Sequence, residues 1–136
     1  MGERPVVVAG AVSGLALVLD EPLSLWGGLD PATGTIIDQH HPQTGQSVTG
    51  KVLVLPSGRG SSGGSSVLAE SVRAGVGPAA VILAVPDPIL VVGGVVLAEL
   101  YPDQAIPIVV ADPSAFADLR TGATVSIDEN GRISGS

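Results

Sequence analysis

The chain has 136 residues, of which 45% are hydrophobic and 14% are charged, and its formal net charge is −7 at pH 7. Domains usually contain about 100–150 residues, so we expect one domain over residues 1–136 rather than a disordered chain. Six basic residues against thirteen acidic ones argue against a nucleic-acid-binding surface. Cysteine is absent, which excludes disulfides, thiolate nucleophiles and iron–sulfur ligation by this chain and fits a cytoplasmic protein.

Two apolar stretches have the length of a targeting or membrane segment. Residues 5–19 could form a signal-peptide core, but Asp20 and Glu21 follow instead of a small-residue cleavage site, so we expect two buried strands. Residues 79–100 are interrupted by Asp87 between two prolines, which would be costly in lipid, so a strand and a helix are expected. We therefore predict no membrane partner. The low charge and high aliphatic content instead predict a surface that a partner chain partly covers.

The first half of the chain is rich in β-formers and shows no helical period. Ser13 and Gly14 read as a turn or bulge between two strands. The stretch from residue 27 to residue 50 is loop-rich, and a loop of this length in a small domain is usually functional or packed against something. The predicted strands of this half lie at residues 5–12, 15–19, 23–26 and 35–37.

The second half alternates between strands and helices. Its strands are short aliphatic runs, which are typical of strands buried on both faces of a parallel sheet. Gly75 is expected to end the first helix, and Asp112 with Pro113 to cap and begin a later one. The strands are predicted at residues 52–55, 80–85 and 106–110, the helices at 67–75, 88–100 and 113–119, and a hairpin at 125–133. This order predicts an α/β fold in which a small parallel sheet carries helices and an antiparallel β layer lies beside it.

The strongest chemical signal is the segment 57–66, which holds four glycines, five serines and Arg59 between a strand and a helix. Glycines let backbone N–H groups approach an anion closely, and a helix start adds unpaired N–H donors and partial positive charge. Together with the guanidinium of Arg59, they predict a site for a carboxylate, a phosphate or a developing oxyanion. A serine-capped flexible turn is the structural alternative, but one capping serine would leave the other four unexplained.

Other interpretations of this loop fit less well. Gly58, Gly60 and Gly63 match the spacing of the dinucleotide fingerprint, but the acidic ribose partner should lie about 20 residues further on, and Asp87 comes later. No lysine follows the glycines, so a P-loop is excluded, and no histidine lies downstream of the loop to complete the triad of a nucleophile elbow. A stand-alone anion-binding or nucleotide-binding module that uses the same loop stays open as an alternative.

The two histidines of the chain, His40 and His41, are adjacent. Neighbouring side chains point in different directions, so we expect one histidine to be solvated and the other to pack within the loop, and we predict no metal site on this chain. Asp30, Asp38 and Asp112 are expected to form turns or helix caps. A phosphohistidine carrier domain is a further alternative, which would need one of the histidines in an exposed glycine-rich turn.

Four segments form a specific combination although each is weak alone. They are Gly-Gly-x-Asp-Pro-x-Thr-Gly at 27–34, Ile-Ile-Asp-x-x-His-Pro at 36–42, Gly-Lys-Val-Leu-Val-x-Pro-x-Gly-Arg-Gly-Ser-Ser-x-Gly-Ser at 50–65, and Asp-Pro-Ile-Leu at 87–90. In this order they resemble the small subunit of the aconitase X family. The resemblance extends over residues 8–110.

This resemblance implies a swivelling β/β/α domain, equivalent to the mobile domain of aconitase. It implies a heterodimer or larger assembly with a large subunit that carries an iron or iron–sulfur centre, and no cofactor on this chain. Family members dehydrate small hydroxy acids: bacterial forms act on cis-3-hydroxy-L-proline, and archaeal two-chain forms act on phosphomevalonate. Gly63 and Gly64 differ from the bulkier pair associated with archaeal members, which favours hydroxyproline.

The resemblance also implies roles for residues of the serine-rich loop. The catalytic serine of the family falls on Ser61, which is expected to accept the substrate proton, with Ser62 as the alternative if the register differs by one. The expected substrate-binding residues are Arg59, Gly60, Ser62 and Ser65.

Overall fold

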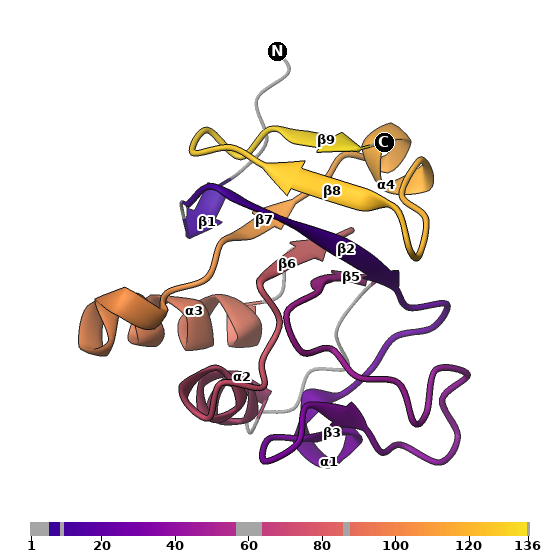
Figure 1. Cartoon of the computed structure of the whole chain (residues 1–136), viewed down its shortest axis with the longest axis vertical. Coiled ribbons are helices and arrows are strands. Elements are labelled where there is room, and N and C mark those ends of the chain that lie inside the picture. Colours follow the sequence, from indigo (N-terminus) through magenta and orange to yellow (C-terminus); the bar gives the residue numbers. More distant parts are fainter. Residues whose placement is uncertain (1–5, 9, 57–63, 86–87, 136) are drawn as a thin grey trace.

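A computed structural model describes residues 6–8, 10–56, 64–85 and 88–135, and it contains a seven-stranded sheet with the order β1-β7-β6-β5-β2-β8-β9 (Figure 1). The four neighbouring strands at its centre run parallel. The strands outside them pair antiparallel. The parallel strands are β2 (Val12–Val18), β5 (Val52–Leu55), β6 (Ala80–Leu83) and β7 (Ile108–Val110). The antiparallel strands are β1 (Val6–Val8), β8 (Thr124–Ile127) and β9 (Ile133–Gly135).

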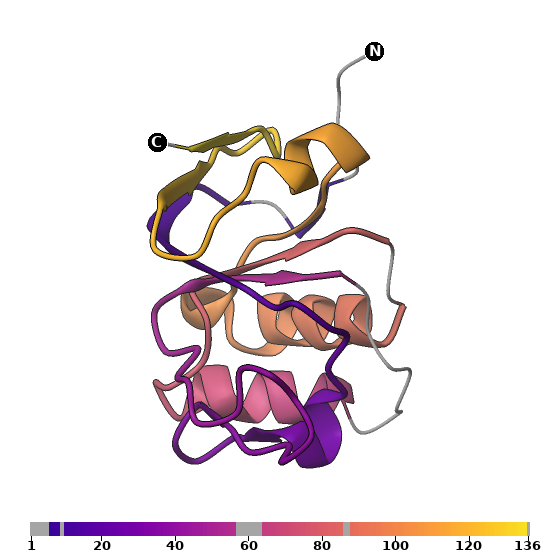
Figure 2. The same ribbon diagram turned by 90° about the vertical axis from the view of Figure 1, so that its right-hand side faces the viewer.

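Helices cover the sheet unequally on its two faces (Figures 1 and 2). Two long helices, α2 (Gly64–Arg73) and α3 (Pro88–Leu100), pack against each other on one face. The short α4 (Pro113–Ala117) lies on the other side, next to the β8–β9 hairpin. The long connection between β2 and β5 packs against α2. It contains α1 (Leu25–Gly28), β3 (Leu29–Asp30) and β4 (Thr35–Ile36), and a 3₁₀ turn (Pro102–Gln104) follows α3.

The parallel strands divide their side chains between two cores, because successive residues of a strand point to opposite faces. In β5, Leu53 and Leu55 belong to the core under α2 and α3, whereas Val52 and Val54 belong to the core under α4 and the hairpin. Strands β6 and β7 alternate in the same way. Every residue of these three strands is buried, which explains their unbroken aliphatic sequences and confirms the predicted parallel sheet.

The mixed α/β architecture expected from the sequence is confirmed, with the antiparallel strands joined to the parallel ones in one curled sheet. The predicted helix at 88–100 is confirmed as α3, in which Gly93 and Gly94 are buried. The N-cap at Asp112 is also confirmed, because its Oδ1 accepts the N–H of Ala115 at 2.8 Å. Among the described residues, no helix combines the length and the apolar character that crossing a membrane requires.

The turn or bulge predicted at Ser13 and Gly14 is wrong. Both residues lie inside β2, where Ser13 pairs with Ser126 and Gly14 pairs with Val125 of β8. The two serine hydroxyls are 3.0 Å apart. Gly14 serves close packing rather than a turn, since a Cβ there would lie 3.2 Å from the carbonyl oxygen of Gly50.

The strand predicted at 23–26 is also wrong. The segment Leu25–Gly28 instead turns at Trp26 (φ −70°, ψ 117°) and Gly27 (φ 81°, ψ −14°). These angles are those of a type II β-turn, whose third position requires a positive φ and therefore favours glycine. The apolar run suggested a strand, but the Trp-Gly pair within it determines a reversal of the chain.

Candidate functional site at the carboxyl edge of the sheet

The carboxyl ends of β2, β5, β6 and β7 meet at one edge of the sheet, on the right of Figure 2. In open α/β sheets, ligands bind outside this edge. Helices α2 and α4 both begin there, after β5 and β7 respectively. The serine-rich segment follows β5, one of the two central parallel strands, and leads to α2, so both of its described ends lie at this edge.

The residues predicted for the site fall mainly in the part of the loop that the structure does not describe. Arg59, Gly60, Ser61 and Ser62 lie outside the described residues, and so does the side chain of Ser65, although its backbone belongs to α2. The structure therefore fixes the two ends of the loop, at Leu55 of β5 and at Gly64 of α2. The individual roles of the predicted site residues stay predictions.

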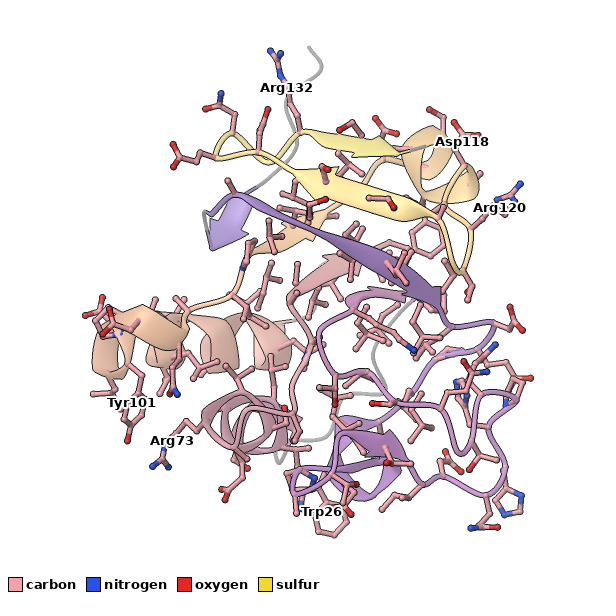
Figure 3. The ribbon with its side chains drawn as sticks, viewed as in Figure 1. Trp26, Arg73, Tyr101, Asp118, Arg120 and Arg132 are labelled. Atoms are coloured by element: carbon pink, nitrogen blue, oxygen red, sulfur yellow. The ribbon has the colours of Figure 1, made fainter. Side chains whose placement is uncertain are left out.

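Trp26 is the side chain near this edge that the sequence reasoning missed. The indole is 62% exposed, whereas Leu23, Leu25 and Leu29 around it are buried. Its turn is held by the Ser24 hydroxyl, which donates to the Trp26 carbonyl at 3.2 Å. Figure 3 shows the ring on the outside of the molecule, and Figure 2 shows α1 beside the end at which α2 begins. The Trp-Gly pair in a type II turn is the signal that could have revealed it.

A polar network holds the segment that leads from β2 to α1. His41 is 4% exposed, and its Nδ1 accepts the N–H of Gln43 at 3.0 Å, so Nε2 carries the proton and donates to the Glu21 carbonyl at 2.9 Å. The Gln43 amide donates to Asp20 Oδ2 at 2.8 Å and accepts the Asp20 N–H at 3.1 Å. His40 is exposed. The expected division between a solvated and a packed histidine is confirmed, and the occupied nitrogens of His41 do not suit a phosphohistidine carrier.

We predict that His41→Ala lowers the free energy of unfolding by about 1–3 kcal/mol, because it leaves the Glu21 carbonyl and the Gln43 N–H without partners. The neighbouring change His40→Ala removes an exposed side chain and is expected to alter stability by less than about 0.5 kcal/mol. Urea unfolding of both variants measures the difference. Equal effects at the two positions would contradict a structural role for the His41 network.

A cavity of about 470 Å³ lies at the carboxyl end of β2, next to this network. Asp20 and Arg120 are its charged residues, and Arg120 also donates to the carbonyl oxygens of Ala117 and Leu119. Arg120 is therefore tied to the segment after α4. The other lining residues are Leu17, Val18, Gln43, Gln46, Leu119 and Thr121.

Helix α3 presents a second exposed apolar surface. Val92, Val95 and Val96 follow helical spacing on its outer side, and Leu100 continues the stripe at its end. Such a surface agrees with the high aliphatic content of the sequence. That a partner chain covers it stays a prediction. At that end, the Arg73 guanidinium of α2 stacks 4.7 Å from the ring centroid of Tyr101 (Figure 3).

Acidic and histidine side chains do not assemble into a metal site within the described ranges, where no three of them form a group that could hold an ion. Asp30 and Asp38 accept hydrogen bonds from nearby N–H groups of their own turns, as expected. The described part of the chain therefore does not fit an iron or iron–sulfur centre, and no reaction step is assigned to a metal on it.

Comparison with known proteins adds the decisive observation about the family. The family model of the aconitase X swivel domain matches residues 3–135. This chain belongs to that family. The aconitase X resemblance of its motifs is thereby confirmed.

Two relatives illustrate the range of the aconitase X family. The chain is 46% identical over 102 residues to a cis-3-hydroxy-L-proline dehydratase of Pseudomonas aeruginosa, an alignment that covers 75% of this chain and 17% of the relative. It is 44% identical over 90 residues to a phosphomevalonate dehydratase small subunit of Methanothermobacter thermautotrophicus, an alignment that covers 66% of this chain and 69% of the relative. The swivel domain thus spans about a fifth or less of the length of the hydroxyproline dehydratases it matches.

A solved structure has the same fold. The crystal structure of Thermococcus kodakaraensis aconitase X, holo-form, superposes on this chain with a TM-score of 0.87 at 31% identity, covering 98% of this chain and 96% of that chain. The swivel-domain fold expected from the sequence is therefore confirmed.

Proposed function

We propose that this chain, as one swivel domain over residues 1–136, is the small subunit of a two-chain cytoplasmic dehydratase that removes water from cis-3-hydroxy-L-proline. The observation that carries the proposal is the serine-rich sequence between the carboxyl end of β5 and the start of α2, in a family whose relatives are named as dehydratases. Ser61 is the proton acceptor, and Arg59, Gly60, Ser62 and Ser65 bind the substrate.

The chemistry of the loop supports this role. Dehydration of a 3-hydroxy acid breaks the Cα–H bond and the C3–O bond, forms a Cα=C3 double bond and releases water. A serine hydroxyl is a poor base unless its alkoxide is stabilised. The start of α2, a cluster of backbone N–H groups and the positive charge of Arg59 supply such stabilisation and can also hold the substrate carboxylate.

The stereochemistry of the substrate suits a site divided between two chains. In cis-3-hydroxy-L-proline the hydroxyl lies on the same face of the ring as the carboxylate, so the Cα hydrogen lies on the opposite face. A base on one side and an acid on the other are then needed. The base then lies on the swivel domain, and the large subunit, with its expected iron or iron–sulfur centre, assists the departure of the hydroxyl.

Phosphomevalonate is the second candidate substrate. The chain matches separate small subunits of phosphomevalonate dehydratase over most of their length, including 88% of that of Methanocella arvoryzae at 36% identity. Gly63 and Gly64 favour hydroxyproline, because the smaller pair differs from the one associated with the archaeal enzymes.

Reconstitution tests the proposal. We expect this chain mixed with an iron-loaded aconitase X large subunit from the same organism to dehydrate cis-3-hydroxy-L-proline, with neither chain active alone. Proton NMR follows the loss of the Cα and C3 signals of the substrate, and phosphomevalonate serves as the comparison. Turnover of phosphomevalonate alone would move the assignment to the second candidate. Binding of nucleotide by the isolated chain, without turnover of either acid by the mixture, would favour the stand-alone binding module.

A further inference from the structure

Trp26 is displayed as a rigid exposed aromatic group. The indole is 62% exposed, although Leu23, Leu25 and Leu29 on both sides of it are almost completely buried. A Cβ on Gly28 would lie 2.8 Å from Leu23 Cδ1, so the base of the turn is tightly packed. The buried side chains on both sides therefore hold the backbone of the turn in place, and the ring loses little conformational freedom when another surface covers it.

The segment that carries the ring is uncharged. No charged residue occurs between Pro22 and Leu29, and Gly27 next to the ring is exposed, with no atom within 4 Å of the position that a Cβ would occupy. The exposed Ile37 lies close to the turn in the main chain, since its N–H donates to the Gly28 carbonyl at 2.8 Å, and the Asp38 side chain also approaches Gly28. Tryptophan is enriched among the hot spots of protein–protein interfaces.

The position of the turn indicates which partner covers it. α1 packs against α2, beside the end of α2 that receives the serine-rich loop (Figure 2). If the proposed function is correct, that loop faces the active centre of the large subunit, so the same subunit passes over α1. A second copy of this chain would instead block access to the loop.

We propose that Trp26 is the anchor through which the swivel domain binds the aconitase X large subunit, with its indole buried in an apolar pocket of that subunit beside the start of α2. This inference rests on the proposed function. The exposed stripe of α3 has no comparable link to the site.

Fluorine NMR provides the direct test. Trp26 is the only tryptophan of the chain, so labelling with 5-fluorotryptophan gives one resonance. In the free chain the chemical shift of this resonance should differ between H₂O and D₂O, because the ring is exposed to solvent. In the complex with unlabelled large subunit, this difference should fall at least twofold, because the ring is then buried. We expect Trp26→Ala to weaken association at least tenfold, and Trp26→Phe to weaken it less.

Leu100→Ala is the matched control. Leu100 is 65% exposed, much as Trp26 is, but lies at the far end of α3, and its loss should change the dissociation constant less than twofold. A larger effect of Leu100→Ala than of Trp26→Ala would mean that the large subunit covers the α3 stripe instead, and would overturn the inference. The inference would be overturned if the wild-type complex were catalytically active but kept the full solvent shift of the free chain, and if the Trp26→Ala chain bound the large subunit with normal affinity. The proposed function would then stay intact. Failure of the wild-type chain to associate with the large subunit would defeat both.

Discussion

Ser61→Ala is expected to lower the turnover of the reconstituted enzyme by about 10²–10⁴-fold, the contribution typical of a positioned general base. The substitution removes the one oxygen that is proposed to take the Cα proton. It leaves the glycines, Arg59 and the start of α2 in place. Association with the large subunit should therefore be unchanged, and the loss should appear in kcat rather than in KM.

The proton-transfer step can be measured separately from the departure of water. When the assembled enzyme is incubated in D₂O, a base acting at Cα is expected to exchange the Cα hydrogen of the remaining substrate, if abstraction is reversible. Ser61→Ala should abolish both this exchange and turnover. Ser134→Ala, at an exposed position of β9, which β2 and β8 separate from β5 in the sheet, is the matched control and should behave like the wild type.

Ser62 is the alternative candidate for the proton acceptor, and the same experiment tests it. If Ser62→Ala causes the larger loss and Ser61→Ala retains most of the turnover, the proton acceptor is Ser62 and the register of the loop differs by one. If both variants turn over at near-normal rates, neither serine is the base, and the loop serves only to bind the substrate. The measured rates of the two variants distinguish these cases.

The central sheet and its helices could be predicted from the sequence because their signals are local. The strand at 52–55 is an unbroken aliphatic run that Pro56 follows, and the structure gives it the predicted bounds. α2 ends just before Gly75, whose φ of +81° suits a residue without a side chain. Asp112 and Pro113 mark the start of α4 in the same way. Each of these signals lies within a few residues of the element it determines.

The errors arose where distant contacts determine the backbone. Gly14 has the local signature of a turn, but pairing with Val125, more than a hundred positions away, keeps it in a strand. The His41 network joins the 38–46 segment to Asp20 and Glu21, and no local pattern announces it. The role of Ser61 came from the resemblance of whole motifs, because a serine-rich turn alone predicts an anion site but not a proton acceptor.

Gly34→Ala is expected to destabilise the fold by about 2–5 kcal/mol, which is a large part of the 5–15 kcal/mol of a typical domain. Gly34 closes the 27–34 motif with a φ of +74°, which costs an L side chain about 1–2 kcal/mol. An added Cβ would also lie 2.5 Å from Thr49 Oγ1 and closer still to the Val76 carbonyl oxygen. Relief of that overlap must displace main chain and break the 2.8 Å hydrogen bond from Thr49 to Val76.

Gly45→Ala separates the two causes. Gly45 has a φ of +89° and nothing within 4 Å of an added Cβ, so its replacement should cost only the conformational term of about 1–2 kcal/mol. Urea unfolding of both variants gives the contribution of the overlap by difference. Adding Thr49→Ala to Gly34→Ala should restore only part of the loss, because the Val76 oxygen belongs to the backbone. Equal destabilisation by Gly34→Ala and Gly45→Ala would show that the loop yields freely at Gly34, and that close packing against the end of α2 does not explain the last glycine of the motif.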